Sequence, residues 1–225
     1  TLGGSAFTID LEAGPFFRVV AGTSLDPVDL EVAGQTLTGI FLFEQHDTTV
    51  TIGFVEVGVA FGDGSNDLVT VSDGAGLFVL TPDGLAGSAE ATVTFDPGAG
   101  IAATGTFALV INTTVDAVSV SVDVGGVTQA IETPAGPFLR VELRDAEITV
   151  GGQVVSGDFL FEQSATPAGG KAVTVAFNDV SLVLGDGASD LVSVTGASGL
   201  FLLTQQGLVG KATGSIAVTP TTGVE

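Results

Sequence analysis

Several blocks of this sequence occur twice, at a nearly constant spacing. Residues 13–19 (AGPFFRV) return as residues 135–141 (AGPFLRV), an offset of 122. Residues 41–45 (FLFEQ) return unchanged as residues 159–163, an offset of 118. The motifs GDG, DLV and GLF return at an offset of 123. Repeated blocks at such a spacing indicate an array of similar structural units, and this constrains the fold more than any single motif does.

The repeat divides the chain into one complete unit and parts of two others. Residues 14–135 form the complete unit, and residues 136–225 form a second unit that stops before its end. Residues 1–13 match the end of a preceding unit, because their Gly-Gly pair stands where Gly125 and Gly126 stand in the complete one. We therefore expect an excerpt from a long tandem array, with about 122 residues per repeat, rather than a complete enzyme.

Within a unit the sequence favours β-strands throughout. Apolar residues alternate with other residues in 89–95, 107–111 and 118–124, a period typical of strands with one buried face. Turn signals such as Thr-Pro-Asp-Gly separate these runs. Such short connections join antiparallel neighbours, since a parallel pair needs a long crossover. The predicted fold is all-β, with antiparallel β-meander modules, either sandwich-like or forming an elongated sheet, stacked as a tandem repeat array.

The alternation changes parity at the same place in both units. In the first unit the apolar side chains move from even to odd positions, and in the second from odd to even. An extra residue in a strand produces such a change while keeping the apolar row on one face. The pattern therefore predicts one β-bulge near Val55 and Glu56 and another near Asn178 and Asp179.

Composition excludes several classes of protein. Hydrophobic residues make up 45% of the chain and charged residues 14%, which is too apolar for intrinsic disorder. The formal net charge is −21, with 5 Lys and Arg, so nucleic-acid binding is excluded because phosphate affinity needs basic clusters. The longest uncharged stretches, 97–115 and 191–210, are interrupted by Gly, Thr, Ser or Gln, and we expect no membrane insertion. The absence of Cys excludes disulfides and thiolate sites.

The best candidate site is a turn with the sequence GDGSND, at residues 62–67, which returns as GDGASD at residues 185–190. Carboxylates and loop carbonyls that converge in a glycine-bent turn suit Ca²⁺, which takes several oxygen ligands. The candidate ligands are Asp63, Asn66, Asp67, Asp186, Ser189 and Asp190, with Asp73 as an additional ligand in the first unit. The turn resembles one unit of the Gly-rich calcium repeats of secreted bacterial toxins and adhesins, which occur in tandem. An ordinary polar hairpin turn is the alternative interpretation.

No arrangement of residues indicates catalysis. Glu44 and Glu162 lie in the repeated FLFEQ block, but glycoside hydrolysis needs a second carboxylate close by. Arg18 and Arg140 also repeat, and we expect each to form an ion pair with the repeated Glu at an exposed strand edge. His46 is the single histidine, so we expect neither a catalytic triad nor a zinc site, and interpret it as a surface residue. We predict that the protein is not an enzyme.

The AGPF(F/L)RV, FLFEQ, (F/L)GDG and GLF(V/L)LT blocks resemble the tandem modules of very large secreted or cell-surface bacterial proteins, which are adhesin-like or fibre-forming. The resemblance implies an extracellular or cell-surface location, a structural role, and calcium as a frequent accessory. The leading hypothesis is a structural repeat module of an extracellular bacterial fibre, filament or adhesin stalk. Its partners are neighbouring repeats of the same chain and other copies in a fibre. The alternative is a calcium-dependent carbohydrate- or surface-binding module.

Overall fold

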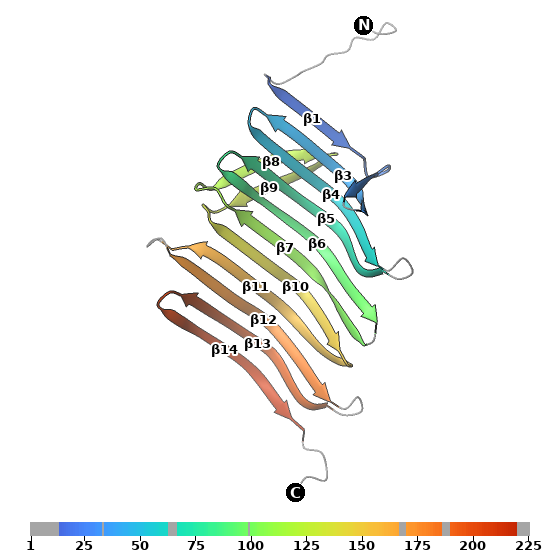
Figure 1. Cartoon of the computed structure of the whole chain (residues 1–225). Helices are drawn as coiled ribbons and strands as arrows, with labels where there is room; N and C mark the ends of the chain where they lie inside the picture. Colours follow the sequence, from blue (N-terminus) through green and yellow to red (C-terminus); the bar gives the residue numbers. More distant parts are fainter. Residues whose placement is uncertain are drawn as a thin grey trace.

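One large open β-sheet makes up most of the molecule. The computed structural model describes residues 14–32, 34–62, 67–98, 100–166, 170–185 and 190–219. Within these residues there is no helix, and 12 strands form a single sheet while two more form a separate hairpin (Figure 1). Neighbouring strands are antiparallel. The predicted all-β class and the antiparallel pairing are therefore confirmed.

The strands follow one another with short connections. Their bounds are β1 (Phe16–Ala21), β2 (Val28–Val32), β3 (Gln35–His46), β4 (Thr49–Gly62), β5 (Asp67–Thr81), β6 (Gly84–Gly98), β7 (Ile101–Asn112), β8 (Val118–Val124), β9 (Val127–Thr133), β10 (Phe138–Val150), β11 (Gln153–Ala165), β12 (Lys171–Gly185), β13 (Asp190–Thr204) and β14 (Gly207–Val218). The repeated FLFEQ block lies in β3 and again in β11.

The order of the strands departs from a simple meander at one point. The sheet runs β1-β3-β4-β5-β6-β7-β10-β11-β12-β13-β14, with the short β2 beside β3. β10 pairs with β7, whereas β8 and β9 pair only with each other and leave the sheet. The alternation of residues 118–124 correctly predicted a strand, but the predicted meander did not place this strand outside the main sheet. The segment reads Val-Ser-Val-Ser-Val-Asp-Val, so it offers one apolar row, which can pack on a sheet face as well as within a sheet.

Bulges keep the apolar rows on one face of the sheet. The pairing of β4 with β5 shifts register between Phe54 and Val57, and the pairing of β12 with β13 shifts between Phe177 and Val180. In each shift an acidic residue has a left-handed backbone, with φ 55° at Glu56 and 49° at Asp179. Both predicted bulges are thus confirmed. β6 and β7 pair without a shift through most of their length.

The β8–β9 hairpin packs on one face of the sheet, across β3 to β7. We call this face the hairpin face. Ile40, Leu42 and Val55 form a buried cluster with Val124 of β8, and Leu77 and Val79 form another with Ile131 of β9. In Figure 1 the hairpin crosses the strands at an angle. Both of these buried clusters therefore lie under the hairpin.

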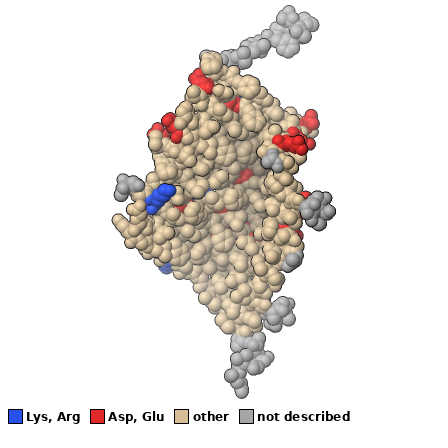
Figure 2. All heavy atoms as spheres, viewed as in Figure 1, with Lys and Arg blue, Asp and Glu red and all other residues tan. Residues whose placement is uncertain are grey.

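The opposite face of the sheet is apolar along its length. From Leu85 to Phe95 in β6, and from Ile101 to Ile111 in β7, the odd-numbered residues on this face are Gly, Ala, Val, Leu, Ile or Phe. Several rings lie over glycines of the next strand, so that a Cβ at the glycine would meet the ring; the pairs are Phe54 with Gly76, Phe78 with Gly87, Phe177 with Gly199 and Phe201 with Gly210. This packing flattens the surface. Figure 2 shows a broad surface with few charged atoms, most of them near its margins.

Candidate functional site

In the sequence, the segments predicted to bind calcium connect β4 to β5 and β12 to β13. Asp67 and Asp190 are the first residues of β5 and β13, and both are exposed. The other predicted ligands, Asp63, Asn66, Asp186 and Ser189, lie outside the described residues. The additional candidate Asp73 lies in a β-bulge, with φ 56°. Among the described residues no group of three or more His, Cys, Asp or Glu side chains could hold a metal ion. Calcium binding stays a prediction.

The repeated Arg and Glu residues form ion pairs, as predicted. Arg18 lies directly opposite Glu44 in the pairing of β1 with β3, with 3.3 Å between Nη1 and Oε2. Arg140 lies opposite Glu162, and its Nε and Nη2 donate hydrogen bonds of 2.9 and 2.7 Å to Oε2 of that residue. Both pairs lie on the hairpin face. Arg18 is on β1, an edge strand of the sheet, as predicted, whereas Arg140 is on β10, which has a neighbour on each side. Cross-strand pairs of this kind stabilise a sheet.

Arg18 also fastens the hairpin to the sheet. Its Nη2 donates a 2.7 Å hydrogen bond to the backbone carbonyl of Asp123, near the end of β8. One guanidinium therefore binds a carboxylate of the sheet and a carbonyl of the hairpin, which its fork of N–H donors allows. No local sequence pattern indicated this second contact, because the two residues are 105 positions apart.

Asn112 anchors the hairpin at its base, a role that no sequence pattern indicated. Its side chain is fully buried, and Nδ2 donates to the carbonyls of Asp116 and Pro134 at 2.8 and 2.7 Å. Its Oδ1 accepts hydrogen bonds from the backbone N–H and the hydroxyl of Thr114, each 2.8 Å. The pattern Asn-Thr-Thr suggests a glycosylation acceptor, but this buried amide is already occupied by structural hydrogen bonds.

A second charged group joins β10 to the first unit. Arg144 of β10 forms an ion pair with Glu90 of β6, and its Nε lies 3.8 Å from Glu142 Oε2. Because β7 lies between β6 and β10, the Arg144 side chain crosses a neighbouring strand. These residues do not recur at matching positions, so repeat comparison could not single them out.

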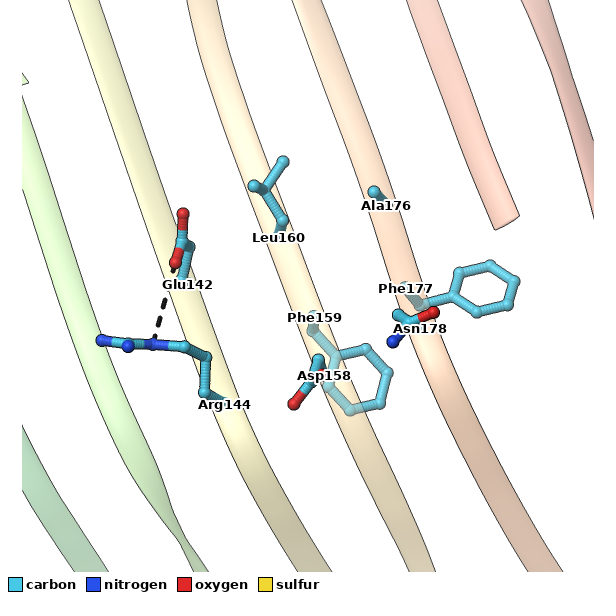
Figure 3. A pocket seen from close by; sticks show the side chains of 8 residues that line it. All are labelled: Glu142, Arg144, Asp158, Phe159, Leu160, Ala176, Phe177 and Asn178. Carbon is cyan, nitrogen blue, oxygen red and sulfur yellow. Dashed lines mark ion pairs between the residues drawn. The ribbon is translucent and has the colours of Figure 1, made fainter. Parts of the chain in front are cut away.

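The hollow beside Arg144 lies on the hairpin face of β10 to β12 and has a volume of about 330 Å³. Figure 3 shows the side chains that line it, which include Glu142, Arg144, Asp158, Leu160, Ala176 and Asn178. Asp158 Oδ1 accepts a 2.9 Å hydrogen bond from the backbone N–H of Asp145, and Asn178 Oδ1 accepts one of 3.2 Å from the Ser198 hydroxyl. The hollow thus combines an apolar floor with polar walls.

The remaining sequence candidates do not assemble a site. His46 is the last residue of β3, half exposed, with Nδ1 3.7 Å from Asp47 Oδ2. Its surface position is confirmed, although it ends a strand. Glu56 accepts a 2.8 Å hydrogen bond from the Ser24 hydroxyl and belongs to a bulge. Each residue therefore has a local structural role.

Comparisons with protein-family models, with curated proteins and with solved structures found no match. In the described part of the chain, no helix is long and apolar enough to cross a membrane. The class that the fold defines is an all-β protein with one large open antiparallel sheet and a hairpin packed on it.

Proposed function

We propose that the chain is a structural repeat module of an extracellular bacterial fibre, filament or adhesin stalk, in which successive units join into one continuous sheet. The observation that carries this proposal is the pairing of β7 with β10, which join the first unit to the second. The two strands are hydrogen-bonded from Phe138 opposite Asn112 to Val150 opposite Ile101. The junction between units is therefore an ordinary strand pair and not a flexible linker.

Side chains reinforce this junction on both faces. On the opposite face the apolar residues Leu139, Val141 and Leu143 lie beside Ile111, Leu109 and Phe107. On the hairpin face Arg144 reaches across β7 to Glu90. Apolar cross-strand pairs and a multistrand ion pair both resist bending between units. An array joined this way behaves as a stiff ribbon whose stability is a sum over units and their junctions.

The strand count gives the proposal a length that can be measured. From β1 to β7 each unit adds six strands to the main path of the sheet, counting β1, β3, β4, β5, β6 and β7. Neighbouring strands are about 4.8 Å apart, so each unit of about 122 residues would lengthen the ribbon by about 29 Å. The high negative charge keeps such a ribbon soluble at high local density.

Chains with one, two or three additional copies of residues 14–135 inserted in the full sequence test the proposal. Electron microscopy and small-angle X-ray scattering would measure their length and cross-section. We expect the length to grow by about 29 Å per copy at constant cross-section. Beads separated by flexible links would contradict the proposal. Imaging with calcium and then with chelator tests the Asp63 and Asp186 turns, because softening in chelator would indicate that bound cations stiffen the ribbon.

A further inference from the structure

The two units differ in what covers the hairpin face. In the first unit, Leu77 and Val79 of β5 are 1% and 5% exposed beneath the hairpin. Their counterparts at an offset of 123 are Leu200 and Leu202 of β13, which are 57% and 36% exposed. β13 has a neighbour on both sides, β12 and β14, so the exposure comes from the uncovered face and not from a sheet edge.

The 330 Å³ hollow lies in the second unit. Its position is equivalent to the position that the end of β8 occupies in the first unit. Leu160 and Ala176, which line the hollow, stand where Leu42 and Gly53 stand in the first unit. There, Val124 packs against Leu42, and a Cβ on Gly53 would meet the Val124 side chain. The hollow is therefore equivalent to the binding position of Val124 in the first unit, which we call the seat, but no hairpin among the described residues occupies it.

Arg140 repeats the fastening group as well. It occupies the position of Arg18 and holds the matching Glu162. Arg18 uses one nitrogen for Glu44 and another for the hairpin carbonyl of Asp123. The apolar residues and the arginine of the second unit thus stand where those of the first unit hold a hairpin.

We propose that the hairpin face of β11 to β14 is a docking site for a second hairpin of the β8–β9 type, which the repeat places in the continuation of the second unit. This inference rests on the proposed function, since the array supplies the hairpin. The occupant carries an apolar row like that of Val118, Val120 and Val122, and an apolar residue at the position of Ile131 to cover Leu200.

The seat also specifies one difference in the docking hairpin. Ile40 and Val55, which contact Val124 in the first unit, are replaced by Asp158 and Asn178 in the second. An apolar tip residue would bury these polar side chains without a new partner, which costs free energy. The docking hairpin therefore carries a hydrogen-bonding residue, such as Thr, at the position of Val124.

An extended chain tests this proposal. Pro220 and Gly223 match Pro97 and Gly100 at an offset of 123, so a copy of residues 103–135 appended after Glu225 continues the repeat in register. Because the chain has no Cys, Leu200→Cys introduces a single thiol, and its maleimide labelling rate measures coverage. Leu203→Cys, at a site 50% exposed on the opposite face, is the matched control.

We expect the appended copy to slow labelling of the Leu200→Cys thiol at least tenfold and to leave the Leu203→Cys rate unchanged. Ile131→Asp in the appended copy alone should restore fast labelling, and Val124→Thr there should slow it further. Equal rates with and without the appended copy would overturn the proposal. If the extended chain does not fold by circular dichroism, a peptide of residues 103–135 added in excess to the 225-residue chain must give the same protection.

The outcome is separable from that of the proposed function. Ribbons that lengthen by about 29 Å per unit while the Leu200→Cys thiol stays exposed would reject the docking site and keep the structural role. Protection of that thiol in chains that form separate beads would reject the continuous ribbon and keep the docking site.

Discussion

The two units of this chain preserve the sheet and diverge where the hairpin sits. Both have the Arg–Glu pair, the bulge with an acidic left-handed residue, and stacked phenylalanine rings with centroids 6.3 Å apart. By contrast, Ile40 and Val55 of the first seat become Asp158 and Asn178 in the second. Sheet positions are constrained by register with two neighbouring strands. The residues that contact the hairpin are constrained by the hairpin alone, so they can change when its sequence changes.

The largest expected effect separates the covered leucine from its uncovered counterpart. Leu77→Ala leaves a cavity between the sheet and Ile131, and we expect it to lower the free energy of unfolding by about 3–5 kcal/mol. Leu200→Ala, at a largely exposed site, should cost less than about 1 kcal/mol. Urea unfolding of the two variants, followed by circular dichroism, measures both. Equal losses would mean that coverage by the hairpin does not distinguish the two leucine positions.

Removing the hairpin anchor comes next in size. Asn112→Ala leaves the carbonyls of Asp116 and Pro134 without their donor, and we expect a loss of about 2–4 kcal/mol. Hydrogen exchange should show faster opening of the β8 and β9 amides, with little change in β12 and β13. The exposed Thr128→Ala in β9 is a control for substitution in the hairpin itself. Uniformly faster exchange across both units would argue against a local anchor.

The glycines beneath the rings test a feature that the two units share. Gly87→Ala would push the Phe78 ring off the sheet and should cost about 1–3 kcal/mol. Gly210→Ala meets the Phe201 ring in the same way, but β14 is an edge strand, so the ring can move aside and the cost should be smaller. Thermal unfolding of the pair gives the comparison. An equal or larger cost at Gly210 would show that the edge strand holds its ring at least as tightly as the interior strand does.

The smallest expected effect is a reciprocal exchange at a bulge. Asp73 has φ 56°, and its counterpart Gly196 has φ 58°. The left-handed backbone disfavours a side chain, so Asp73→Gly should raise the free energy of unfolding by about 0.5–1 kcal/mol and Gly196→Asp should lower it by a similar amount. Chemical denaturation with matched slopes can resolve this. Effects of the same sign in both variants would contradict the explanation.

The sequence predicted those features that depend on neighbours in the strand or on the repeat. Alternation and short turns were sufficient for the antiparallel sheet, and the change of parity located the bulges at Glu56 and Asp179. The repeated Arg and Glu predicted the ion pairs. Repeat comparison could not find Asn112 or Arg144, whose roles come from partners on other strands or at the base of the hairpin.

By itself, the sequence determined that the chain forms β-strands with an apolar row on one face, because the period of two and the turn residues act locally. Only the tertiary structure decided which strand occupies the free edge of β7. β10 offers 13 residues and β8 offers 7, so the longer strand gains more backbone hydrogen bonds and more apolar cross-strand contacts. β8 and β9 then pair with each other and bury valines on the sheet face. The covered clusters therefore depend on the competition between β8 and β10 for the edge of β7.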